Sequence, residues 1–130
     1  MYLFKSFTAK NMELRNRVVM PPMCMYSAGT DGMATDFHFT HYTSRAVGGV
    51  GLIIMEATGV VPCGRISDHC LGLWNDTQAQ KLAPIVTACQ KQGAKIAIQL
   101  NHAGRKCEAQ EKTIYAPSAV AFNQDSPMPQ

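Results

Sequence analysis

The stretch "VGLIIMEATGV", residues 50–60, decides how this sequence is expected to fold. It is a long apolar run, rich in β-branched residues, and it lacks the strict alternation of a strand that faces water on one side. Such a pattern is typical of a strand covered on both faces, as in a parallel sheet flanked by helices. The residues on either side should therefore supply covering helices and further strands.

A helix is expected before this strand, in "TDFHFTHYTSRAV", residues 35–47. Its less polar residues recur at helical spacing, and Thr35 or Asp36 can cap its amino end. Gly48 and Gly49 should end it, because glycine adopts the backbone conformations that close a helix.

A second helix is expected in "NDTQAQKLAPIVTACQKQG", residues 75–93. Asn75 or Asp76 is the expected cap, and Gly93 is the expected stop. Pro84 lies inside this segment and should kink or divide the helix, because proline lacks an N–H and its ring clashes with the preceding turn.

Two more strands complete the pattern. "AKIAIQLNHAGRK", residues 94–106, begins as another buried strand, and residues 18–20 form a short apolar run. Residues 6–20 are expected to form a β-hairpin about Lys10 and Asn11, which leads into that run. Strand, helix, strand, helix, strand is the order of an α/β fold, a parallel sheet with right-handed crossovers.

Chemically distinctive residues follow each strand of the predicted sheet: Cys24 and Tyr26, then Glu56 and Ala57, then Gln99 and His102. The carboxyl ends of parallel strands meet at one edge, which is where such folds bind ligands. Taken singly, Cys24 is more often a structural thiol and Tyr26 a packing residue. Their shared position favours a binding site.

The length of the chain is a further clue. Three parallel strands leave an unpaired edge on each side, and a closed eight-stranded barrel needs about 250 residues, whereas this chain has 130. The sequence therefore resembles part of a larger fold.

Composition excludes several classes. The net charge is +3, with scattered lysines and arginines, which argues against nucleic-acid binding. Without a signal peptide or an apolar run of membrane-spanning length, a cytoplasmic location is expected. The five cysteines include no C-x-x-C pair, so reduced thiols are expected, and no metal is expected because His38 and His41 lack a third ligand.

Three stretches together resemble the Old Yellow Enzyme family of flavin-dependent ene-reductases, specifically its thermophilic-like class. They are "LRNRVVMPPMCMYS" (14–27), "HYTSRAVGGVGLIIMEATGVVPCGRI" (41–66) and "AKIAIQLNHAGRK" (94–106), with "APSAVAF" (116–122) in the expected place. The resemblance implies a (β/α)8 TIM barrel that holds FMN at the carboxyl ends of its strands. Residues 1–130 would be the N-terminal portion of that single domain, an N-terminal β-hairpin and about three βα units.

The cofactor-binding residues that the resemblance implies are Pro21, Pro22, Met23, Cys24, Ala57 and Gln99. The first four match the segment that runs along the flavin, although Pro21 replaces an expected small residue, which removes a backbone donor. Ala57 matches a small residue near the ring, and Gln99 matches an amide that binds the pyrimidine edge. A glutamine amide suits that edge because it both donates and accepts.

The same resemblance implies that Cys24 tunes the flavin and that Tyr26 lines the substrate pocket. A phenol can donate a hydrogen bond to a substrate carbonyl that gains charge during reduction. Lys106 and Arg105, next to His102, would have a supporting role near the pocket. Read without the resemblance, this cluster is either an anion site or a charged loop.

The implied reaction is ping-pong: NADPH or NADH reduces FMN, and hydride then passes to the activated C=C bond of an α,β-unsaturated carbonyl or nitro compound. The family's substrate-oxygen ligands, proton donor and phosphate loops would lie beyond residue 130. The implied partners are therefore a small activated alkene, the remaining barrel in the same or a second chain, and further copies in a homo-oligomer.

Two other interpretations remain open. The chain could be a non-catalytic, self-associating fragment without flavin, because its sheet edges are unpaired. It could also be the N-terminal part of a dienoyl-CoA-reductase-like iron–sulfur flavoprotein, although "CMY" at residues 24–26 argues against this.

Overall fold

The computed structural model describes residues 1–130 and confirms the predicted order of elements. The strands are β1 (Phe7–Ala9), β2 (Met12–Leu14), β3 (Val19–Met20), β4 (Leu52–Gly59) and β5 (Lys95–Asn101), and the α-helices are α1 (Asp36–Val47) and α2 (Asp76–Lys91). Three 3-10 helices cover Tyr2–Phe4, Pro62–Gly64 and Gly104–Lys106. Neither α-helix is long and apolar enough to cross a membrane.

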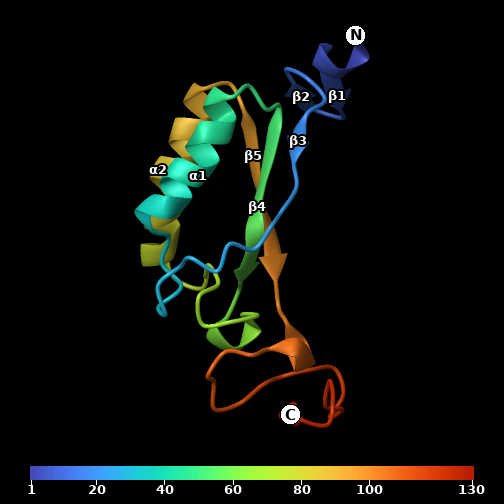
Figure 1. Cartoon of the computed structure of the whole chain (residues 1–130), viewed down its shortest axis with the longest axis vertical. Helices are drawn as coiled ribbons and strands as arrows, with labels where there is room; N and C mark the ends of the chain where they lie inside the picture. The colour runs from blue at the N-terminus through green and yellow to red at the C-terminus, as the bar shows by residue number, and fades with distance from the viewer.

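The strands form the two expected sheets. β1 and β2 pair antiparallel around Lys10, whose φ of 51° fits a tight turn. β3, β4 and β5 pair in parallel, in that order, so each crossover carries one helix. Figure 1 shows α1 and α2 on one side of this sheet, with the hairpin at its amino end and the C-terminal segment at its carboxyl end.

The helices begin where the sequence predicts. Thr35 caps α1 in a capping box, in which His38 Nδ1 accepts the Thr35 N–H at 3.1 Å. Asn75 caps α2 by accepting the Gln78 N–H at 3.0 Å. The expected division of the second helix is wrong, because α2 runs unbroken through Pro84. Pro84 is exposed, so the carbonyl that it leaves without a donor can bind water.

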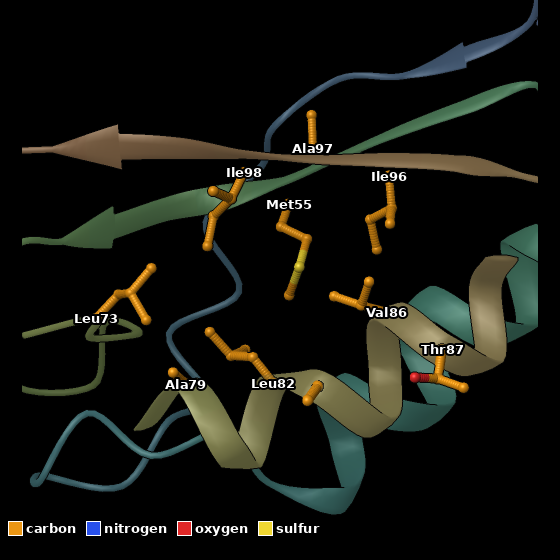
Figure 2. Close-up of a pocket in the computed structure, with 10 residues that line it drawn as sticks. Met55, Leu73, Ala79, Leu82, Val86, Thr87, Ile96, Ala97 and Ile98 are labelled. Atoms are coloured by element: carbon orange, nitrogen blue, oxygen red, sulfur yellow. The ribbon is translucent and has the colours of Figure 1, made fainter. Parts of the chain in front are cut away.

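The two faces of the sheet differ sharply. Ile53 and Met55 of β4 are fully buried against the helices and belong to one apolar core. On β5, Ile96 and Ile98 point toward α2 while Ala97 points to the opposite side, as Figure 2 shows. Ala97 is exposed, so the face away from the helices has no cover within this chain.

A β-bulge in β4 changes which residues reach that open face. Met55 pairs with Ile98, but the next pair is Ala57 with Gln99, which leaves Glu56 as an extra residue. Because paired residues in neighbouring strands point the same way, the bulge places Ala57 and Gln99 together, on the face that Ala97 shares. Glu56 is turned into the helix layer and is fully buried.

An apolar groove of about 420 Å³ lies beside α2. Figure 2 shows its walls, which are the side of α2 that faces the strands, with Ala79, Leu82 and Val86, and the helix-facing side of β4 and β5. Nine of its ten lining residues are hydrophobic, among them Leu82, Val86 and Ile98. Apolar side chains at the β5 side of the helix layer are therefore left without a covering element in this chain.

Each end of the sheet is held by one arginine. At the amino end, Arg15 donates to the carbonyls of Ala46, Val50 and Gln92 at 2.6–3.2 Å, and so joins the ends of both helices to β4.

At the carboxyl end, Arg65 is buried and donates to the carbonyls of Thr30, Pro62 and Asp68 and to Glu111 Oε1 at 2.8 Å. It therefore gathers the loops that follow the strands.

Candidate functional site at the carboxyl ends of the strands

The segment that follows β3 crosses the carboxyl end of β4. Cys24 is half-buried, and its thiol lies beside the Ala57 backbone and the Tyr26 side chain. Met25, between them, donates its N–H to Glu56 Oε2 at 3.0 Å. The structure therefore brings together the predicted residues Cys24, Tyr26 and Ala57.

The side chains of Cys24 and Tyr26 are both neutral at physiological pH. Burial, followed by the nearby Cys70, raises the pKa of the Cys24 thiol, and a hydrogen bond from the Ala57 backbone only partly opposes this. The pKa of Tyr26 is also raised, chiefly by Cys24, and its side chain is 51% exposed. The turn thus presents a weakly polar thiol and an accessible phenol that can donate a hydrogen bond.

Ala57 and Gln99 are paired neighbours on β4 and β5; Ala57 is buried, with Cys24 against its backbone, whereas Gln99 lies on the open face. Gln99 is exposed, and its amide forms no hydrogen bond within the chain. A small side chain beside a free amide can accept a flat heterocycle, with the amide both donating to and accepting from its edge. This arrangement fits the pyrimidine side of a flavin.

Pro21, Pro22 and Met23 form the extended link between β3 and Cys24. Pro21 and Met23 are exposed, and Pro22 is half-buried. Pro21 has no N–H to donate, so it could contact a ligand through van der Waals packing of its ring but not through a backbone N–H hydrogen bond.

Lys106 lies apart from these residues. It ends the 3-10 helix Gly104–Lys106, and its Nζ lies 4.5 Å from the centre of the Phe122 ring. No hydrogen bond or ion pair joins it to Cys24 or Tyr26. The structure therefore does not bring Lys106 into the turn, and its supporting role stays a prediction.

The sequence interpretation gave no role to a buried polar cluster behind the turn. Glu56, Tyr42 and His38 are each at most 1% exposed. Tyr42 donates to Glu56 Oε1 at 3.1 Å and accepts the Glu56 backbone N–H at 3.0 Å. The available signal was a single carboxylate inside the apolar run 50–60, a residue type that is rarely buried without partners. His38 and His41 are both buried in the helix layer.

Burial controls the ionisation of this cluster. It raises the pKa of the Glu56 carboxyl, although the hydrogen bonds from Met25 and Tyr42 oppose that shift. It raises the pKa of Tyr42 and lowers that of His38. Tyr42 and His38 are therefore neutral at physiological pH.

The sequence matches the NADH:flavin oxidoreductase / NADH oxidase family over residues 2–129. It is 54% identical over 129 residues to a NADPH dehydrogenase of Clostridium acetobutylicum, covering 99% of this chain and 38% of that protein. A NADPH dehydrogenase of Bacillus subtilis is 53% identical over 128 residues, again covering 38% of the relative. The chain thus spans 38% of the length of these curated relatives.

A solved structure agrees. Old Yellow Enzyme from Pichia sp. AKU4542 superposes with a TM-score of 0.85 at 32% identity, over 94% of this chain and 33% of that one. Such neighbours are TIM barrels, so the expected fold class is confirmed and this chain supplies about a third of a barrel. Members of the family use FMN with NAD(P)H. The chain belongs to the NADH:flavin oxidoreductase / NADH oxidase family, which includes the Old Yellow Enzymes.

Proposed function

We propose that this chain is the N-terminal part of an NAD(P)H-dependent FMN ene-reductase, which reduces the activated C=C bond of α,β-unsaturated carbonyl or nitro compounds. The observation that carries the proposal is the grouping of Cys24, Tyr26, Ala57 and Gln99 at the carboxyl ends of the strands, in a chain of this family. FMN, when bound, would supply the hydride transfer.

The proposed cofactor contacts come from residues on or beside the face of β4 and β5 that the helices leave uncovered. Gln99 would bind the pyrimidine edge with its free amide, and Ala57 would leave room for the ring because its side chain is a single methyl group. Pro21, Pro22 and Met23 would pack along the flavin. Their exposed positions beside this face support the assignment.

Cys24 and Tyr26 would act on either side of the reacting ring. A neutral thiol alters the potential of a neighbouring flavin without adding a fixed charge, and Cys24 is held neutral by burial. Tyr26 would donate a hydrogen bond to the substrate oxygen. Lys106, an exposed residue that follows β5 at this end of the sheet, would support substrate binding.

The rest of the barrel must come from the same gene product or a second polypeptide. The open face of β4 and β5 would become the barrel interior, and the apolar groove beside α2 would receive the next helix. A homo-oligomer and a small activated alkene complete the proposed set of partners.

A denaturing mass spectrum of the purified protein tests the proposal first, because it reports every polypeptide present and any released FMN. Detection of FMN with a polypeptide that contains the remaining barrel supports the proposal. The complete protein should then oxidise NADPH only when an activated alkene, such as 2-cyclohexenone, is added. This chain alone, without flavin, would favour the self-associating fragment.

Residue-level support comes from one matched pair of variants. Gln99→Ala should lower FMN occupancy, because it removes the proposed amide contacts. Gln80→Ala, on the exposed side of α2, is the control and should leave occupancy unchanged. Equal occupancy in the two variants would contradict the cofactor assignment of Gln99.

A further inference from the structure

Glu56 occupies an unusual position for a carboxylate. It is the extra residue of the β4 bulge, lies between the sheet and α1, and is fully buried. A buried carboxyl group destabilises a protein unless hydrogen-bond donors surround it. The chain retains this group where an apolar residue would continue the run of β4, so its contacts call for an explanation.

Its two oxygens have separate partners. Oε2 accepts the backbone N–H of Met25 at 3.0 Å, and Oε1 accepts the hydroxyl of Tyr42 at 3.1 Å. The Tyr42 oxygen in turn accepts the backbone N–H of Glu56 at 3.0 Å, so the tyrosine proton is free to point at the carboxylate. Side chain and backbone of Glu56 are thus both fixed by Tyr42.

His38 adds a third group on the same side. Its Nδ1 accepts the N–H of Thr35 at 3.1 Å, so the neutral ring carries its proton on Nε2. That Nε2 has no hydrogen-bond partner of its own and lies 3.5 Å from Glu56 Oε1. Oε1 therefore lies between two residues of α1, of which Tyr42 is hydrogen-bonded to it and His38 is in contact, and Oε2 is left for Met25.

The Met25 contact joins this cluster to the proposed site. Met25 is the only residue between Cys24 and Tyr26, and Tyr26 has a φ of 50°, in the left-handed region that non-glycine residues rarely adopt. Such a conformation persists only where the surroundings enforce it. The bond from Met25 to Glu56 is the one long-range hydrogen bond that the backbone of residues 24–26 makes.

We propose that Glu56 is a positioning residue, which, backed by Tyr42 and His38, holds the Cys24–Tyr26 turn in the conformation that presents the thiol to the flavin and the phenol to the substrate. This inference rests on the proposed function. Glu56 touches neither group directly and acts through the Met25 N–H. The bulge that frees Glu56 for this task also places Ala57 beside Gln99, so one irregularity in β4 serves both sides of the site.

The test uses the complete flavoprotein and compares Glu56→Gln with Cys89→Ala. Glutamine keeps the size of the side chain but replaces one acceptor oxygen with a donor, so the Met25 N–H or the Tyr42 hydroxyl loses its acceptor. Cys89 is fully buried in α2 and belongs to the apolar core. Its truncation lowers stability without touching the turn, which makes it the control for a purely structural effect.

Three readouts separate positioning from stability: the flavin reduction potential, the Kd of the phenolic probe 4-hydroxybenzaldehyde, and hydrogen exchange of the Met25 amide. Glu56→Gln should keep FMN, shift the potential, weaken the probe about tenfold and accelerate the exchange. Cys89→Ala should lower the Tm and leave all three readouts at the wild-type values.

The proposal is overturned if Glu56→Gln lowers the Tm as Cys89→Ala does and changes none of the three readouts. If Glu56→Gln does not fold, Tyr42→Phe takes its place, since it keeps the carboxylate and removes one donor. It should then shift the same readouts in the same directions by smaller amounts, and unchanged readouts overturn the proposal. A wild-type protein without FMN would contradict the proposed function instead, and Met25 exchange in Glu56→Gln would still decide whether Glu56 holds the turn.

Discussion

The two ends of the β3–β4–β5 sheet are built around an arginine each, yet they use it differently. Arg15, at the amino end, binds only backbone carbonyls: Ala46 in the last turn of α1, Gln92 just after α2, and Val50 just before β4. Arg65, at the carboxyl end, binds loop carbonyls and the Glu111 carboxylate. One arginine fastens regular elements and the other fastens loops.

This difference teaches where function can reside in such a sheet. At the amino end the acceptors of Arg15 lie at or next to the ends of the helices and β4, so a change there is expected to alter stability. At the carboxyl end the segment after β3 carries Cys24 and Tyr26 next to Ala57, the partner of Gln99, so under the proposed function a change there is expected to alter chemistry. The division agrees with barrels in general, whose active sites lie at the carboxyl ends of the strands.

Of the variants considered, Arg15→Ala should lower the stability most. It should leave the flavin chemistry unchanged if the amino end has a purely structural role. The variant loses four charge-assisted hydrogen bonds at a partly exposed site, which should lower the free energy of unfolding by about 3 kcal/mol. Urea unfolding of the complete protein measures this loss. An altered flavin potential in the variant would contradict the structural role of the amino end.

Gly51→Ala also tests whether the amino end of the sheet contributes to stability. A Cβ at this position would lie 2.6 Å from the backbone oxygen of Asn16, so the strand or the Asn16 loop must shift. Overpacking of this kind should cost about 2 kcal/mol of stability. Gly49→Ala is an informative partner, since no atom lies within 4 Å of its Cβ but its φ of 95° strains any side chain. Wild-type stability in Gly51→Ala would refute the close contact.

His41→Phe tests the helix layer between the two ends. Burial, then Arg45, lowers the pKa of His41 in the folded protein, so the folded state resists a proton that the unfolded chain accepts. Stability that is present above pH 6.5 is therefore lost as the pH falls through the lowered pKa, by at most about 1.4 kcal/mol per pH unit for one proton. Phenylalanine keeps the ring but cannot titrate.

Urea unfolding at pH 7 and pH 5 should show a smaller acid loss in His41→Phe than in the wild type. His38 shares the lowered pKa, so part of the loss should remain in the variant. Identical pH dependence in both proteins would show that His41 does not resist protonation.

At the carboxyl end, Tyr26→Phe should weaken binding of 4-hydroxybenzaldehyde by about 1 kcal/mol, because it removes one hydrogen bond to the probe. Its exposed side chain predicts little change in stability. Titration of the flavin absorbance measures the affinity. Tyr115→Phe, another exposed tyrosine, is the matched control, and equal affinities in the two variants would remove Tyr26 from the pocket.

Cys24→Ala should have the smallest effect on stability and a specific one on the flavin. Alanine removes the half-buried thiol beside Ala57 but leaves the Met25 hydrogen bond in place. The reduction potential should shift while FMN remains bound. Cys63→Ala, at another half-buried cysteine, should leave the potential unchanged, and an unchanged potential in Cys24→Ala as well would end the tuning role.

Much of the fold follows from local patterns. The unalternating run at 50–60, the caps Thr35 and Asn75, and the stop at Gly93 are short-range signals, and each predicted its element correctly. Of the two expected effects of Pro84, a kink or a division, the division did not occur, because the clash and the missing donor are local, whereas the integrity of α2 depends on packing along its buried side. Tertiary contacts overrode the local preference.

The site was less predictable for a geometric reason. Strand order alone brings Cys24, Ala57 and Gln99 to one end, so their proximity could be expected. The bulge at Glu56 could not be read from the sequence, since a bulge is set by pairing between strands far apart in the chain. For the same reason the partnership of Glu56 with Tyr42 and Met25 was not foreseen.

The bulge has a consequence for how this sequence can change length during evolution. Loss of the Glu56 codon would restore regular pairing between β4 and β5, a gain in sheet regularity that ordinary strands would tolerate. In this chain the same deletion would remove the acceptor of the Met25 N–H. Insertions and deletions should accordingly accumulate in the loops of this family and be selected against at this one position of β4.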